Sequence, residues 1–281
     1  MSGARLHTRL LPEHPPTRRG AGRLGRHIRH DPRSLAYQVA AKPLGELTSV
    51  RHRRYIPVLN QGDLGACTGY AALGAVGTGP LFTALSGNPG CPSETDAAAD
   101  GIRAATLYST ATKLDDVAGT YPPHDTGSSG LAVAKATKNA GLISGYRHAT
   151  SLEAALTALE SSPVITGINW YDSFDAPDDD GVVRITPDAS VRGGHEVVLD
   201  MLDTADHLVW LTNSWGGSWG HDGTAAVSWD DFGRLLDEDG DVTVFAPVTE
   251  PAPRPSDEDT ELVGCLTKLI PLAQRWLKSR A

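Results

Sequence analysis

The hydrophobic pattern of the chain changes once, near Pro163, and this change limits the folds that the chain can adopt. Before Pro163, apolar and small residues recur at helical spacing. After it, short apolar runs alternate with turn residues, which is typical of strands. Helices first and strands later predict an α+β fold of two lobes, a helical lobe over residues 56–143 and an antiparallel β lobe over residues 144–248.

The two patterns also predict individual elements. Residues 67–78 are mostly small and apolar and contain no proline, so they predict a buried helix that begins at Cys67. Two further helices are predicted at residues 129–140 and 152–160, the second with Ser151 as its N-cap. Strands are predicted at residues 164–170, 182–185, 195–201, 208–212 and 224–229.

Charge divides the chain into a basic N-terminal arm, residues 1–55, and an acidic body, residues 56–248. The arm contains twelve Lys/Arg and three Asp/Glu, so 13 basic and 31 acidic residues remain in the rest of the chain. A basic segment tethered to an acidic body can dock on it as an inhibitory segment, contact nucleic acid, or stay solvated. The sequence leaves these three interpretations open, with nucleic acid the least favoured.

The chain beyond the body has a different composition. Residues 249–260 contain three prolines and an acidic run, which is typical of a linker. Residues 261–281 carry leucines and a tryptophan on one helical face, which predicts an amphipathic helix. We expect this helix either to dock on a partner and localise the protein, or to pack on the body.

Composition argues against several classes of protein. No apolar run approaches the ~18–20 residues of a membrane span. The Arg-rich N-terminus lacks the apolar core of a secretory signal, so we expect a cytoplasmic protein, or a virus-encoded intracellular one. The three cysteines form no Cys-x-x-Cys pair, which disfavours a zinc site and a disulfide scaffold. No metal or organic cofactor is expected.

The segment Asn60-Gln-Gly-Asp-Leu-Gly-Ala-Cys-Thr-Gly-Tyr70 is the most informative part of the chain. It resembles the signature of the papain/cathepsin family of cysteine peptidases, Gln-Gly-x-Cys-Gly-[Ser/Ala]-Cys-[Trp/Tyr]. The matching residues are Gln61, Gly62, Gly65, Ala66 and Cys67. The resemblance implies a papain-like fold with the active cleft between its two lobes, and hydrolysis of peptide bonds.

Two later blocks support the resemblance. Residues 193–199, Gly-Gly-His-Glu-Val-Val-Leu, resemble the family's strand that carries the catalytic base. Residues 213–216, Asn-Ser-Trp-Gly, followed by Trp219, resemble its asparagine block. His195 and Asn213 follow Cys67 by 128 and 146 residues, which agrees with the order and spacing in the family.

The resemblance implies a catalytic role for four residues. Cys67 is the nucleophile, and a helix N-terminus together with a neighbouring imidazolium would favour its thiolate. His195 protonates the leaving amine and then activates water against the thioester, while Asn213 orients its ring. The Gln61 side chain and the Cys67 backbone N–H supply the donors to the oxyanion.

The resemblance also implies contacts with a polypeptide substrate at Gly65, Gly194 and Trp215. The glycines allow close approach of a bound chain, and Trp215 covers the contact between the histidine and the asparagine. The family's Gly-rich stretch that binds substrate backbone has no clear match, and residues 127–130 are the candidate.

The chain differs from the family at three points. Leu64 replaces a disulfide cysteine, Thr68 replaces an aromatic residue, and the arm lacks the family's helical pro-region signature. Two alternative functions therefore stay open. An enzyme of the same fold can act as an amidase or transpeptidase, and a catalytically silent module can keep the fold for binding or structure.

Overall fold

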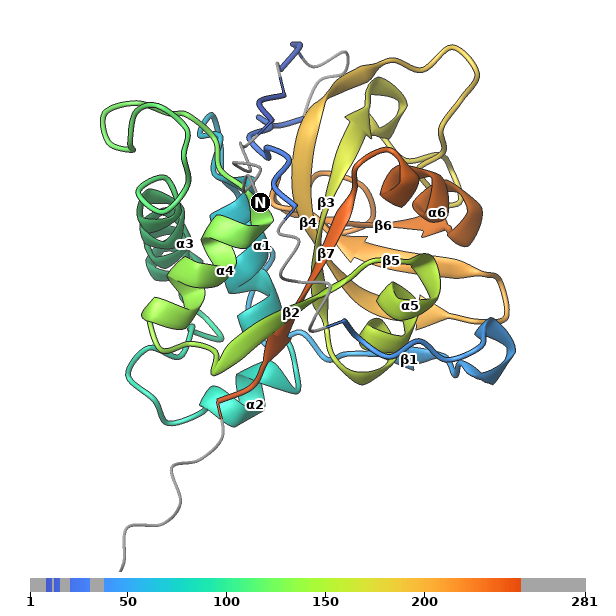
Figure 1. Ribbon diagram of the computed structural model, residues 1–281, viewed down its shortest axis with the longest axis horizontal. Coiled ribbons are helices and arrows are strands. Elements are labelled where there is room, and N and C mark those ends of the chain that lie inside the picture. The colour runs from blue at the N-terminus through green and yellow to red at the C-terminus, as the bar shows by residue number, and fades with distance from the viewer. Residues whose placement is uncertain (1–8, 12, 16–20, 31–37, 249–281) are drawn as a thin grey trace, which may run out of the picture. The chain divides into compact units, whose positions relative to one another are not determined.

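The computed structural model of the protein describes residues 9–11, 13–15, 21–30 and 38–248, which belong to one unit (Figure 1). The predicted linker and amphipathic helix, residues 249–281, lie outside the described residues. The helices are α1 (Cys67–Val76), α2 (Leu81–Leu85), α3 (Ala97–Ala111), α4 (Gly130–Asn139), α5 (Leu152–Ser161) and α6 (Trp229–Asp237), with 3-10 turns at Leu44–Glu46 and Asp172–Asp175. The strands are β1 (Val50–Arg51), β2 (Gly145–Ala149), β3 (Val164–Tyr171), β4 (Val191–Asp203), β5 (Leu208–Thr212), β6 (Thr224–Ser228) and β7 (Asp241–Ala246).

The described strands form one antiparallel sheet. Its order is β2-β7-β3-β4-β5-β6, and β1 adds to β4. Strand β4 is the longest and pairs with β1, β3 and β5. The pairing of β1 shows that residues 50–51, which charge alone assigned to the arm, belong to the sheet.

The helices fall into two groups around this sheet. Figure 1 shows α1, α3 and α4 together on the left, and the sheet with α5 and α6 on the right. The first group shares a buried apolar cluster with Ile165, Val198 and Phe245 of the sheet. A second buried cluster joins α5, α6 and the rest of the sheet. This two-lobed arrangement confirms the α+β fold predicted from the sequence.

Helix α1 lies where the two lobes meet. All ten of its residues are buried, and it packs against α3, α4 and β4. Small residues allow this packing, because a Cβ at Gly69 would overlap the Ala104 carbonyl oxygen and lie 2.8 Å from Tyr108 N in α3. A helix that is apolar on all sides is stable only in an interior. The first residue of α1, Cys67, therefore has a closely fixed position.

Most of the predicted elements are confirmed. Helices α1, α4 and α5 occur where the sequence predicted them. Ser129 and Ser151 cap α4 and α5 by accepting hydrogen bonds from the N–H groups of Ala132 and Ala154. Among the described residues, no helix has both the length and the apolar character needed to span a bilayer.

The strand predicted at residues 182–185 is wrong. Val182 makes a single bridge to Ala226, and the residues after it do not pair as a strand. The cause is Asp178, whose carboxylate accepts from the Val182 N–H at 2.9 Å and from Arg184 Nε at 2.8 Å. These bonds fold the segment into a turn that the pattern of apolar residues does not reveal.

Replacing Gly69 with valine should destabilise the protein, because the side chain would force α1 away from α3. Overpacking of this kind costs about 1–3 kcal/mol, so we expect the melting temperature to fall by roughly 3–10 °C. Gly101→Ala in α3 is the matched control, since its Cβ would lie 3.6 Å from Tyr70 Oη, an ordinary contact. Equal melting temperatures for both variants, measured by circular dichroism, would contradict this account of α1.

Candidate active site

The N-terminus of α1 carries the cysteine that the motif singles out. Ala66 precedes it as the N-cap, and no side chain caps the first N–H groups. The positive end of the helix therefore lies at the Cys67 thiol, which is fully buried. The backbone of Glu196 in β4 lies close enough to this sulfur to oppose, in part, the rise of the thiol pKa that burial causes. Cys67 thus lies against the strand that carries His195.

His195 and Asn213 form the pair that the sequence predicted. His195 Nε2 lies 2.7 Å from Asn213 Oδ1, which also accepts from the Ser214 N–H at 2.7 Å. The rings of Trp170 and Trp215 cover the imidazole at centroid distances of 4.8 and 4.9 Å. Because an amide oxygen only accepts, Nε2 carries the proton. The other nitrogen, Nδ1, has no hydrogen-bond partner among the described residues and can act as a base.

Burial keeps both reactive groups neutral in this state. It raises the pKa of the Cys67 thiol, and the charge of Glu196 adds to the effect. Burial also lowers the pKa of His195 to about 3; the hydrogen bond with Asn213 opposes this shift and the charge of Arg192 adds to it. The thiolate–imidazolium pair that the family chemistry implies is therefore not formed while the site is buried.

The Gln61 side chain lies at the same site, with every polar atom engaged. Its Oε1 accepts from Ser214 Oγ at 2.5 Å, and its Nε2 donates to the Leu64 carbonyl at 2.7 Å. The second Nε2 bond goes to the carbonyl of Arg23, at 3.1 Å. This carbonyl belongs to the N-terminal arm, and Trp215 Nε1 lies 3.4 Å from it. The amide proposed to bind an oxyanion is thus occupied by a backbone oxygen of the chain itself.

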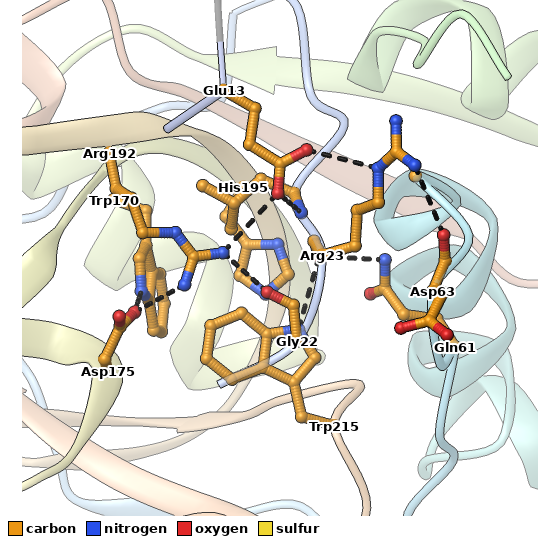
Figure 2. A network of polar contacts seen from close by, with 12 residues as sticks. Glu13, Gly22, Arg23, Gln61, Asp63, Trp170, Asp175, Arg192, His195 and Trp215 are labelled. Atoms are coloured by element: carbon orange, nitrogen blue, oxygen red, sulfur yellow. Dashed lines mark hydrogen bonds and ion pairs between the residues drawn. The ribbon is translucent and has the colours of Figure 1, made fainter. Parts of the chain in front are cut away.

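Residues 21–30 of the arm cross the site and contact both of its sides (Figure 2). A Cβ at Gly22 would overlap the Trp215 ring, and a Cβ at Gly25 would overlap the carbonyl of Gly65. Only glycine permits this approach. The carbonyl of Gly194 accepts from the N–H groups of Gly25 and Arg26 at 3.2 and 3.0 Å.

On the side of the site opposite β4, the arm backbone binds residues 127–130, the candidate Gly-rich stretch. The N–H of Ser128 donates to the Gly25 carbonyl at 2.8 Å, and the N–H of His27 donates to the Ser128 carbonyl at 2.7 Å. The arm therefore lies between residues 127–130 and β4 as an added extended segment. Gly65, Gly194 and Trp215, which the sequence assigned to substrate contact, all touch this segment.

Solved structures with a similar backbone are cysteine proteases. The chain matches xylellain, a cysteine protease from Xylella fastidiosa, with a TM-score of 0.60 at 17% identity over 83% of this chain and 99% of xylellain. It also matches the digestive procathepsins L 3 and L2 of Tenebrio molitor larval midgut, with TM-scores of 0.53 and 0.52 at 16% identity. These matches cover 81% and 83% of this chain and 76% and 80% of the procathepsins. No protein-family model and no curated protein sequence matches the chain.

The chain has the papain-like fold. The resemblance inferred from three short motifs is thereby confirmed at the level of the fold.

Arg192 completes the closed site of this papain-like fold, although no motif indicated it. Its Nη1 lies 2.7 Å from Asp175 Oδ1, and its Nη2 donates to the Gly22 carbonyl at 2.5 Å (Figure 2). The guanidinium carbon lies 5.4 Å from the Trp215 ring centroid. The sequence shows it only as an arginine three positions before His195, and its full burial is visible only in the fold.

The described residues offer no metal-binding cluster. No group of three or more His, Cys, Asp or Glu side chains among them could hold a metal ion. Cys67 and Cys91 are free thiols, so the candidate nucleophile is not consumed by a disulfide.

Iodoacetamide should modify Cys67 more slowly than Cys91 in the native protein at pH 8. Burial raises the pKa of both thiols, but Cys67 is fully buried whereas Cys91 is partly exposed, so the reagent reaches Cys91 more readily. We expect a rate ratio of at least about tenfold, because a cost of about 1.4 kcal/mol to expose Cys67 is a factor of ten in its accessible fraction. Peptide mapping by mass spectrometry measures both sites in one sample. Equal rates in the native protein would contradict the closed site, and equal rates in urea are the control.

Proposed function

We propose that the protein is a cysteine peptidase that hydrolyses peptide bonds through a thioester on Cys67. The observation that carries the proposal is that Nδ1 of His195 has no hydrogen-bond partner among the described residues. The contact with Asn213 holds the imidazole ring, and the strand that carries His195, β4, packs against α1. A nucleophile, a base and a residue that orients the base therefore occur together. The cysteine proteases among similar solved structures agree with this assignment.

The proposed reaction uses each of these groups in turn. His195 takes the thiol proton, and the Cys67 sulfur attacks the carbonyl carbon of the scissile bond. His195 then gives the proton to the leaving amine, and a water molecule activated by the same ring hydrolyses the thioester. The Gln61 amide donates to the oxyanion at the place where the Arg23 carbonyl now lies.

We further propose that the arm inhibits the enzyme by lying in its cleft. The Arg23 carbonyl accepts a hydrogen bond from the Gln61 amide, and the N–H groups of Gly25 and Arg26 donate to the Gly194 carbonyl. Arg192 of β4 holds the arm at two points, because its Nη2 donates to the Gly22 carbonyl and lies 3.6 Å from Oε1 of Glu13, another residue of the arm. Of the three interpretations of the arm, these contacts favour inhibition.

Gly22→Leu should activate the full-length protein, because a side chain there cannot fit against Trp215. A loss of about 1.4 kcal/mol in docking of the arm would open the cleft about tenfold more often. We therefore expect at least a tenfold rise in kcat/KM on a mixture of unstructured peptides. Gly45→Leu is the matched control, since nothing lies within 4 Å of a Cβ there. Equal activity of Gly22→Leu and wild type would show that the arm does not inhibit.

Cys67→Ala should abolish hydrolysis in the Gly22→Leu protein. The nucleophile has no substitute, so we expect a loss of at least about 10³-fold. Cys91→Ala in the same background is the control and should retain activity, because Cys91 lies on a different segment of the helical lobe. Hydrolysis that survives Cys67→Ala would refute the peptidase mechanism. Transfer of an acyl group to an added amine, with no net hydrolysis, would instead identify a transpeptidase.

A further inference from the structure

Three neighbouring strands form a slot in the sheet beside the candidate active site. Gly167 of β3 pairs with Glu196 of β4 on one side and with Asp241 of β7 on the other. Paired residues of antiparallel strands point to the same face, so the two carboxylates stand on either side of a glycine. A Cβ at Gly167 would lie 2.8 Å from Glu196 Oε2 and would overlap Arg26 Nε. The missing side chain is what opens the slot.

The side chain of Arg26, from the arm, fills this slot. It is fully buried, and its Nη2 forms an ion pair with the Asp241 carboxylate and donates to the Asp239 carbonyl at 2.8 Å. Gly130, at the N-terminus of α4, closes the other side. A Cβ there would lie 2.9 Å from Asp241 Oδ1 and 3.0 Å from Glu196 Oε1. The slot is therefore shaped around a guanidinium.

Arg26 leaves part of this slot unused. Both carboxylate oxygens of Glu196 are buried without a hydrogen-bond partner among the described residues, and so are Nε and Nη1 of Arg26. Burial raises the pKa of Glu196, and the charge of Asp241 adds to the shift while that of Arg26 opposes it. Buried carboxylates are normally paired or hydrogen-bonded. A guanidinium with its fork between both carboxylates would satisfy donors and acceptors that the arm leaves free.

The slot opens onto the reactive residues. Glu196 follows His195 directly, and both its backbone and its charge influence the pKa of the Cys67 thiol. The backbone N–H of Arg26 donates to the Gly194 carbonyl. A chain lying along this wall therefore places a side chain in the slot and its backbone beside the nucleophile. If the arm departs, it removes the only cation that the described residues place between the two carboxylates.

We propose that the slot between Glu196, Gly167 and Asp241 is a specificity pocket that binds an arginine side chain of the polypeptide substrate in place of Arg26. The inference rests on the proposed peptidase function and names its substrate class. Lysine is a weaker ligand, because a single ammonium lacks the planar fork that spans two carboxylates.

Binding to the pocket is tested without catalysis in the full-length Arg26→Ala protein. The probe is n-propylguanidinium, which replaces the missing part of the side chain. We expect a saturable rise in melting temperature at millimolar probe, little rise with n-propylammonium, and none in wild type, where the slot is filled. Adding Gly167→Ala or Asp241→Asn should abolish the rise. Arg26→Ser, which also leaves the slot empty, is the second variant to use if Arg26→Ala does not fold.

Specificity is tested by cleavage in the Gly22→Leu protein, whose pocket residues are intact. Peptides that differ only by arginine, lysine or leucine at each position near the scissile bond are digested together and quantified by mass spectrometry. We expect arginine at one fixed position to raise kcat/KM at least about tenfold over lysine or leucine. Asp241→Asn should reduce that ratio toward one.

The outcomes separate this inference from the proposed function. Cleavage with no preference for arginine at any position overturns the pocket and leaves the peptidase. A saturable n-propylguanidinium effect without cleavage of any peptide overturns the peptidase and supports the pocket as a guanidinium site. If n-propylguanidinium has no effect in both Arg26 variants, the buried Arg26–Asp241 pair is structural only and the pocket is refuted.

Discussion

The packing of α1 against β4 is the contact on which the rest of the site depends. The helix is buried on all sides, and it packs directly against β4. The proposed nucleophile on this buried helix and the proposed base on the central strand are held by rigid elements rather than by loops. The register of β4 matters equally, because a shift of one residue would exchange the faces of His195 and Glu196. Chemistry and the proposed recognition of substrate therefore depend on the same strand.

In the proposed mechanism the arm acts on this site sterically and electrostatically at once. The Arg23 carbonyl accepts from the Gln61 amide, and the N–H groups of Gly25 and Arg26 donate to the Gly194 carbonyl, which are contacts that the proposal assigns to the substrate. The arm also covers the site that contains Cys67 and His195. Burial is the main cause of the raised pKa of Cys67 and of the lowered pKa of His195. Rehydration on release of the arm removes part of that cause, which brings both pKa values back toward their usual ranges. One movement thus vacates the cleft and favours the reactive ionisation states.

The sequence predicted those parts of the site that lie in short continuous blocks. The segment around Cys67, the strand block at His195 and the block at Asn213 each carry several defined residues, so their order and spacing could be read directly. Local chemistry also predicted the cap at Ser151, because an N-cap bond joins residues three positions apart. The helix α3 was missed although Asp96 caps it, since its alanines lack a clear apolar stripe.

Contacts between distant segments could not be predicted in this way. Arg192 meets the Gly22 carbonyl across 170 positions, and Arg26 meets Asp241 across 215. Neither pair has a local pattern, and a lone arginine in a basic arm looks like any other solvated charge. Strands β2 and β7 were missed for a related reason. They pair with each other across almost the whole β lobe, and the pairing of polar residues such as His148 with Thr243 gives no apolar run.

Glu196 connects the proposed recognition of arginine with the reactivity of the thiol. Its charge is one cause of the raised pKa of Cys67, second to burial. A guanidinium in the slot favours the charged form of Glu196, as Arg26 does in the closed state by opposing the rise of its pKa. When the arm leaves, the slot loses this cation, and burial together with the charge of Asp241 then favours the protonated, neutral form of Glu196. In the proposed pocket a substrate arginine restores the ion pair while the backbone beside it reaches Cys67. Occupation of the pocket and the protonation state of Glu196 are then linked, so a peptide without arginine lacks the ion pair even where its backbone fits.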